Sequence, residues 1–209
     1  MSKFKPLKME IVNLNAIPIA HDKNVYLVNA KELNAIKRTK YRTPNDGFYL
    51  SQSVFLLKNK ALSSLKKFII NKAKEYTREV LEIKDEIYLT QSWSTINTTN
   101  SSHKLHAHLN TFISIVYYAQ CRGGHTYFDL NASPIREGFN FQYTVTKGNI
   151  YNSQTWKFPV RTGDIMLFPG HIRHGSTPNR SQQNRIIVGA NFFIKGKLGS
   201  EKDVSLITI

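Results

Sequence analysis

Two histidines one residue apart, His106 and His108, stand at the start of a run of β-forming residues, TFISIVYYAQ. On a strand, residues i and i+2 point to the same face with Cα atoms about 6–7 Å apart, so the pair could offer two neighbouring ligands to one metal ion. A third ligand is expected from residues 163–179, where His174 follows an apolar strand and a Pro-Gly turn. The spacing therefore predicts a three-histidine metal site.

An arginine follows the distal histidine by eleven residues. Arg185 opens the apolar strand RIIVGANFF, and a charge at the start of an inward-facing strand is costly to bury unless it meets an opposite charge. A guanidinium can bind a carboxylate through two parallel hydrogen bonds. Each element alone is weak evidence, but their order in a β-rich context predicts a metal site beside an anion site.

The strands that would position these residues lie in the second part of the chain. From residue 86 onward, short β-forming runs alternate with Gly, Pro, Asn and Ser; the runs are 86–94, 111–120, 125–130, 139–146, 150–158, 164–168 and 185–194. About seven short strands with no helical pattern between them predict a mainly β architecture, an antiparallel sandwich or jelly roll.

The first part of the chain has a different pattern. Residues 9–13 and 25–29 look like short strands, and apolar residues at near-helical spacing over 53–82 predict one amphipathic helix with at most one break. Its lysines lie mostly on the other side, as expected for a packing helix with a solvated face. We expect a single domain over 1–209, with a mixed α/β lead-in (1–84) and a jelly-roll core (85–209).

Composition limits the class of protein. The chain has 209 residues with 41% hydrophobic and 11% aromatic content, enough for one sizeable core. A single cysteine, Cys121, rules out a disulfide framework or a cysteine zinc site within one chain. The N-terminus has no uninterrupted apolar region, and no stretch approaches the roughly 18 apolar residues that span a bilayer. A soluble, cytoplasmic protein with no membrane association is expected.

The charge is strongly positive, with 29 Lys and Arg against 14 Asp and Glu, a net +15. This balance favours an anionic partner. The basic residues are scattered, however, and no helix-turn-helix, zinc-finger or RNA-recognition signature accompanies them, so nucleic-acid binding is not favoured. Exposed sheet edges make a homodimer plausible.

The chain resembles the iron(II)- and 2-oxoglutarate-dependent oxygenases, whose core is a double-stranded β-helix (jelly roll). It is most similar to a small microbial and phage-associated branch with Ser-Trp, His-x-His, Ser-x-Val-Tyr-Tyr, Phe-Pro, His and Arg in that order. The matching segments are SWSTIN (92–97), HAH (106–108), SIVYYAQ (114–120), GGHTYFDL (123–130), GDIMLFPGHIRHGSTPN (163–179) and NRIIVGANFF (184–193). The resemblance covers roughly residues 88–195.

The resemblance implies roles for individual residues. His106 and His174 would be iron ligands, and His108 would occupy the place usually held by an aspartate. Arg185 would clamp the distal carboxylate of 2-oxoglutarate, and Tyr118 would hydrogen-bond the same carboxylate, unless it is a core aromatic. The implied reaction is O2-dependent hydroxylation of an unidentified substrate with decarboxylation of 2-oxoglutarate to succinate and CO2.

His108 is a departure from the family pattern. Two histidines and one carboxylate normally leave three positions open for 2-oxoglutarate and oxygen. A neutral imidazole leaves one more positive charge at the metal, which should strengthen anion binding but donate less charge to the metal during oxidation. Altered or absent activity therefore stays open, and the spacing of Asp129 does not favour it as a substitute ligand.

Other functions fit part of the pattern. A cupin-type metal enzyme shares the fold and the His-x-His motif, but its first motif expects a glutamate where this chain has Phe112 and Ile113. A three-histidine zinc site could activate water for hydrolysis, although Arg185 would then lack an explanation. A basic, non-enzymatic jelly-roll binding module, or a structural protein with a vestigial site, are the remaining alternatives.

Overall fold

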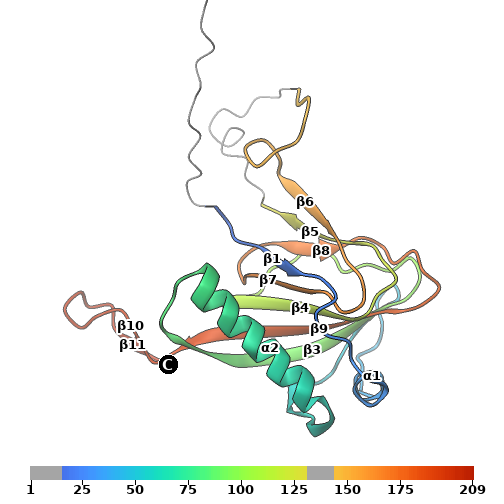
Figure 1. Ribbon diagram of the computed structural model, residues 1–209, viewed down its shortest axis with the longest axis horizontal. Helices are drawn as coiled ribbons and strands as arrows, with labels where there is room; N and C mark the ends of the chain where they lie inside the picture. The colour runs from blue at the N-terminus through green and yellow to red at the C-terminus, as the bar shows by residue number, and fades with distance from the viewer. Residues whose placement is uncertain (1–15, 131–143) are drawn as a thin grey trace, which may run out of the picture.

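Two antiparallel sheets form the body of the protein. The computed structural model describes residues 16–130 and 144–209. The larger sheet has the order β1-β7-β4-β9-β3-β2 and the smaller one β6-β5-β8 (Figure 1). Their strands are β1 (Ala20–Asp22), β2 (Phe48–Leu50), β3 (Glu86–Asn97), β4 (Ile113–Gln120), β5 (His125–Asp129), β6 (Thr155–Pro159), β7 (Ile165–Pro169), β8 (His174–Ser176) and β9 (Arg185–Lys195). A separate ribbon pairs β10 (Lys197–Leu198) with β11 (Ile207–Thr208). The expected mainly β architecture is confirmed.

The central strands of the larger sheet are buried on both faces. Along β4, Ile115 and Tyr117 belong to one hydrophobic cluster, whereas Val116 and Tyr118 belong to another. Because successive side chains on a strand point to opposite faces, the two clusters fill the two sides of the sheet. This double burial explains why β4, β7 and β9 are nearly continuous apolar runs in the sequence.

Helices cover one face of the larger sheet. In Figure 1, α2 (Ser63–Glu75) crosses that face, and its residues Leu65, Ile69 and Ala73 are buried in the cluster there. The shorter α1 (Ala30–Lys37) begins with a capping box between Asn29 and Glu32. The buried Glu32 carboxylate also accepts the backbone N–H of Leu65, 3.2 Å away. The Glu32 carboxylate thereby joins the two helices. Because the helices cover only this face of the sheet, the other face is available for the site.

The predicted helix over residues 53–82 has a more varied form than the pattern indicated. Two 3-10 turns, Leu56–Lys58 and Lys60–Leu62, precede α2, and a π-helical turn, Tyr76–Val80, follows it. The extended backbone of Asn59 separates the two 3-10 turns. None of the described helices is long and apolar enough to cross a membrane.

Some expected strands differ from the observed ones. Residues 25–29 do not form a strand, so that prediction was wrong; the backbone N–H of Val25 instead donates to Gly163 O at 3.0 Å. The expected strand 9–13 and residues 139–143 of another lie outside the described residues, and 144–146 are not in a strand. The three-residue strands β1, β2 and β8 were not predicted, because so few residues carry no readable alternation.

Candidate metal centre

The His-x-His pair lies on a loop, not on a regular strand as the sequence suggested. Residues 98–112 connect β3 to β4 and make a single β-bridge, between His106 and His174. His106 N–H donates to His174 O at 3.0 Å, and His174 N–H donates to His106 O at 2.8 Å. His108 N–H donates to Gly170 O at 3.0 Å. The two bonds to His174 hold His106 against β8, where His174 is the first residue, and the bond to Gly170 holds His108 beside the end of β7.

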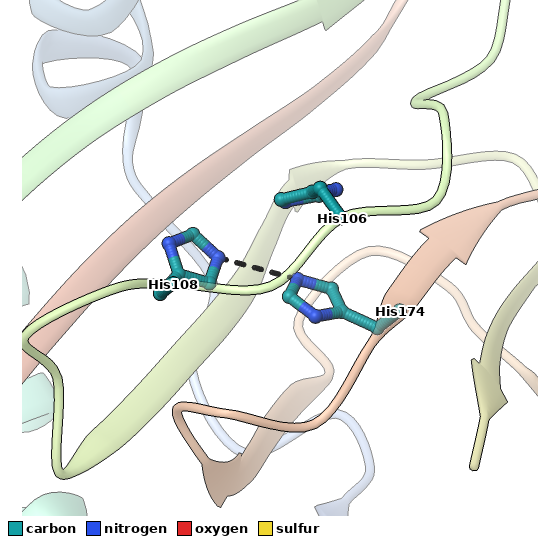
Figure 2. Close-up of side chains that lie close together, drawn as sticks. All are labelled: His106, His108 and His174. Carbon is teal, nitrogen blue, oxygen red and sulfur yellow. Dashed lines mark hydrogen bonds between the residues drawn. The ribbon is translucent and has the colours of Figure 1, made fainter. Parts of the chain in front are cut away.

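The three imidazoles converge on one point. Each of His106, His108 and His174 offers a ring nitrogen, and these atoms all lie within 4.8 Å of one another. Figure 2 shows His108 and His174 facing each other, with their Nε2 atoms 3.4 Å apart. Two neighbouring nitrogens bound to one metal at about 2.1 Å would be about 3.0 Å apart in a six-coordinate site and about 3.4 Å apart in a tetrahedral one. The spacing therefore suits neighbouring ligands of one ion.

Backbone carbonyls orient two of the rings. His106 Nδ1 lies 2.8 Å from Lys104 O, and His174 Nδ1 lies 3.0 Å from Ile172 O. A carbonyl oxygen only accepts hydrogen bonds, so each Nδ1 carries the proton and each Nε2 keeps its lone pair. A hydrogen bond of this kind from the outer nitrogen is the usual support of a histidine that binds metal. His106 and His174 are thus prepared as ligands through Nε2.

Burial keeps the cluster neutral. It lowers the pKa of His174 to about 2 and that of His108 to about 4, with a further contribution from the neighbouring His106. The pKa of His106 is lowered as well, again by burial. Neutral imidazoles retain the lone pairs that a metal needs.

We expect the stability of the metal-free protein to fall as the pH is lowered from 6.5 towards 4. The unfolded chain takes up protons near the ordinary histidine pKa of 6.5, whereas the folded His108 and His174 resist protonation. The unfolded state then binds more protons, so the free energy of unfolding rises with pH in this window. Urea unfolding at pH 7.5 and pH 5, with a chelator present, would measure it. His174→Ala should show a shallower dependence, and an equal slope in both proteins would contradict the assignment.

A fourth histidine extends the cluster. The His103 ring stacks on Phe48 with centroids 4.5 Å apart and on His106 at 4.0 Å. Burial and the neighbouring histidines lower the pKa of His103 to about 3. His103 lines the same pocket as the other three, although no motif in the sequence points to it. His103 lies three residues before His106, and two residues three apart would point to opposite faces of a regular strand.

The pocket continues from the histidines to a buried arginine. Arg185 is 2% exposed, and its Nη2 donates to Ser176 Oγ at 3.1 Å and to Thr177 O at 2.6 Å. Its Nη1 is buried without any hydrogen-bond partner among the described residues. Burial lowers the pKa of Arg185 from its ordinary value, but a guanidinium stays charged at neutral pH. A buried cation with an unused donor calls for an anion in this pocket.

Three hydroxyl groups line the pocket that contains Arg185. Tyr118 is buried, and its hydroxyl hydrogen-bonds Thr126 Oγ1 from β5. Burial raises the pKa of Tyr118, so the hydroxyl stays protonated. Ser176 Oγ accepts from both His103 N and Arg185 Nη2, which leaves its own hydrogen free to donate. Ser176 and Thr126 were missed in the sequence because single hydroxyl residues on short strands carry no distinguishing pattern.

Asp129 does not join the metal cluster. It is the last residue of β5, and its backbone N–H donates to Arg173 O at 3.0 Å. Within the described residues, the group of side chains placed to share a metal consists of the three histidines and contains no carboxylate. His108, and not an acid, is the third member of this group.

Trp93 closes the pocket beside His108, with ring centroids 5.2 Å apart. It pairs across β3 and β9 with Gly189, where an added Cβ would stand 2.4 Å from the indole Cε2. The glycine therefore makes room for the indole.

Gly189→Ala is expected to cost about 1–3 kcal/mol of stability, the usual cost of forcing an extra carbon into a packed site. Urea unfolding would measure the change. In a Trp93→Ala background, Gly189→Ala should cost much less, because the group with which the added carbon clashes is gone. A Gly189→Ala protein as stable as the wild type would show that the indole can move freely.

The segment that contains this site matches the model of a known protein family. The model described as "Putative 2OG-Fe(II) oxygenase" matches residues 91–191, the segment that holds the three histidines and Arg185. The expected resemblance to the 2OG-Fe(II) oxygenases is confirmed over this segment. The expected enzyme class is thereby confirmed, together with the Fe(II) cofactor and the 2-oxoglutarate co-substrate that the family's description names. A search of curated proteins gives no match.

Solved oxygenase structures share the fold. HygX from Streptomyces hygroscopicus, with nickel, 2-oxoglutarate and hygromycin B bound, is 11% identical with a TM-score of 0.58, covering 84% of this chain and 82% of that one. A Pseudomonas putida prolyl-4-hydroxylase is 10% identical with a TM-score of 0.56, covering 86% and 94%. A 2OG-Fe(II) oxygenase family protein from Burkholderia pseudomallei is 10% identical with a TM-score of 0.57, covering 83% of each chain. At these identities the likeness supports the fold, and the expected jelly roll is confirmed.

Proposed function

We propose that this oxygenase binds Fe(II) through His106, His108 and His174 and uses Arg185 to hold 2-oxoglutarate for the hydroxylation of a further substrate. The observation that carries the proposal is the buried Arg185 Nη1 without a partner, in the same pocket as three converging imidazoles. Imidazole nitrogens suit iron among the divalent metals. The donor set and the unused guanidinium nitrogen fit the two groups that the family requires.

The co-substrate would lie between the histidines and the arginine. Arg185 Nη1 and the free hydrogen of Ser176 Oγ would donate to the distal carboxylate, and the Tyr118 hydroxyl would support it. Nη2, which is already bound to Ser176 and Thr177, keeps the guanidinium in place. The 2-oxo-acid end would then face the three imidazoles. Arg185 thus orients the co-substrate through a charge-assisted hydrogen bond.

Apolar residues complete the pocket. Val116 from β4 and Ile187 from β9 also line it. They would limit the access of water to the reacting atoms. When bound together, Fe(II), 2-oxoglutarate and O2 supply the oxidising power, with succinate and CO2 as products.

The two other metal-enzyme alternatives explain less of the site. A cupin-type centre or a hydrolytic zinc centre could use the three histidines equally well. Neither gives a reason for a buried arginine with a free donor a short distance along the same pocket. Binding of a dicarboxylate beside the metal accounts for both halves of the site.

The test is anaerobic addition of Fe(II) and then 2-oxoglutarate to the purified protein. Chelation of the metal by the 2-oxo acid should produce a new visible absorption band, and admission of O2 should convert 2-oxoglutarate to succinate. Once the right substrate is present in a pool of candidates, a hydroxylated product should form together with succinate. If 2-oxoglutarate neither binds nor changes the metal spectrum, the proposed function is wrong.

Partner and location predictions accompany this proposal. The net charge of +15 favours an anionic primary substrate. A homodimer, a single domain and a cytoplasmic location stay predictions from the sequence. Sedimentation of the purified protein would measure its oligomeric state.

A further inference from the structure

A chain of buried polar groups leads from the metal site into the larger sheet. Asn191 on β9 pairs in register with Ser114 on β4, and the two residues are 3% and 1% exposed. Ser114 Oγ donates to Asn191 Oδ1 at 2.9 Å, and Asn191 Nδ2 lies 3.4 Å from His108 Nδ1. His108 Nε2 in turn lies 3.4 Å from His174 Nε2. Four side chains are therefore connected, in a sheet whose neighbouring positions are apolar.

The hydrogen bonds along this chain run in one direction. His174 carries its proton on Nδ1, bound to Ile172 O, so its Nε2 can only accept. His108 must then donate from Nε2, which leaves Nδ1 as an acceptor for the Asn191 amide. The Asn191 oxygen accepts from Ser114, so each bond has one donor and one acceptor.

Metal binding needs the opposite direction at His108. A ligand nitrogen gives its lone pair to the metal, so Nε2 must lose its proton and Nδ1 must carry one instead. Nδ1–H would then face the Asn191 amide N–H, donor against donor. Rotation of the amide by half a turn removes the conflict, because Oδ1 then accepts from His108 while Nδ2 donates to Ser114. A hydroxyl serves either direction, since it both donates and accepts.

We infer that Asn191 is the positioning residue for His108: its amide turns over when metal binds and holds His108 in the Nδ1–H form that presents Nε2 to the ion. The inference rests on the proposed function, because it concerns the same metal site. It also gives a physical reason why a histidine can replace the usual carboxylate here. A carboxylate has no tautomers to select, whereas an imidazole in this place needs an outer partner that fixes its proton.

Nuclear magnetic resonance of ¹⁵N-labelled histidine side chains tests the inference directly. The probe is Zn(II), which is diamagnetic and also accepts imidazole nitrogens. In protein stripped of metal, His108 should carry its proton on Nε2; after Zn(II) is added, the proton should be on Nδ1. His106 and His174 should hold theirs on Nδ1 throughout. A His108 that keeps one tautomer in both samples would overturn the inference.

Substitution of Asn191 supplies an independent test, with Zn(II) affinity measured by competition against a chelator. Asn191→Leu removes the acceptor and should weaken binding by about 10- to 100-fold, as loss of an outer partner typically does. Asn191→Asp keeps an acceptor in the required orientation and should bind at least as tightly as the wild type. Asn97→Leu is the matched control: Asn97 is also buried in this sheet, but its side chain bonds Ser101.

The role through His108 can be separated from a general effect on packing. In a His108→Ala background, Asn191→Leu should leave the residual Zn(II) affinity unchanged, because the ligand on which it acts is gone. An equal loss in both backgrounds would overturn the inference and leave the metal site intact. Wild-type protein whose three histidine resonances do not respond to Zn(II) would instead contradict the proposed function itself. The two failures are therefore distinguishable.

Discussion

Arg185→Ala is expected to weaken 2-oxoglutarate binding by about 10²- to 10³-fold while metal affinity stays close to that of the wild type. Removing one partner of a buried, hydrogen-bonded charge pair typically costs about 3–5 kcal/mol, and each 1.4 kcal/mol is a tenfold change. Arg185 Nη1 has no hydrogen-bond partner among the described residues and is therefore available to the co-substrate. The alanine variant would lose that hydrogen bond entirely. Anaerobic titration of the Fe(II)-loaded protein with 2-oxoglutarate, followed by absorption, gives the affinity.

Two further arginine variants sharpen this experiment. Arg185→Lys retains the charge but not the paired donors, so its affinity for 2-oxoglutarate should lie between those of the wild type and Arg185→Ala. Arg180→Ala is the matched control, because Arg180 is exposed five residues earlier and bonds the Asn100 side chain at 2.8 Å. Loss of metal from Arg185→Ala with unchanged 2-oxoglutarate affinity would contradict the role given to Arg185.

The site was predictable to the extent that its chemistry is concentrated in few residue types. The chain has seven histidines. The order His106-x-His108, then His174, then Arg185 is the one that resembles the metal and co-substrate motifs of the oxygenases. The long strands β4 and β9 were predictable for a related reason. Burial on both faces makes them continuous apolar runs that stand out between turn residues.

The local geometry of the site could not be predicted from the same signals. His106 and His108 were placed on a strand because β-forming residues follow them, yet they lie on a loop with one β-bridge to His174. The bridge depends on β8, which is three residues long and therefore too short for its own pattern. Its partner is 68 residues away along the chain, so the pairing arises from tertiary packing. The backbone bonds that orient the rings follow from that packing.

Polar residues within the apolar strands gave the weakest signal. Ser114 and Asn191 interrupt apolar runs and are almost fully buried, at positions where a lone polar residue is costly without a partner. Each side chain finds its partner on the neighbouring strand, and strand register cannot be read from one sequence. Ser176 and Thr126 join the arginine pocket for a similar reason, since β5 and β8 meet only in the folded sheet.

His174→Ala is expected to remove metal binding more completely than any outer substitution. His174 is 4% exposed and makes contact with both other ligands, through the His106 bridge and the His108 ring. Loss of an outer partner costs about 10- to 100-fold in affinity, so loss of a ligand itself should cost more than that. Two imidazoles alone leave the ion held mainly by water. Chelator competition with Fe(II) or Zn(II) would measure the change, and 2-oxoglutarate should no longer alter the Fe(II) spectrum.

The control for His174 lies on the same turn of chain. His171 is exposed three residues earlier and is outside the group of converging nitrogens, so His171→Ala should bind metal like the wild type. A small void is the main structural cost of His174→Ala, and His174→Gln, which fills much of that space without an imidazole, separates the void from the ligand. Metal affinity lost in both variants with unfolding little changed would assign the loss to the ligand. Metal affinity retained by His174→Gln and His174→Ala alike would mean that the ion binds elsewhere, and the converging imidazoles would then need another explanation.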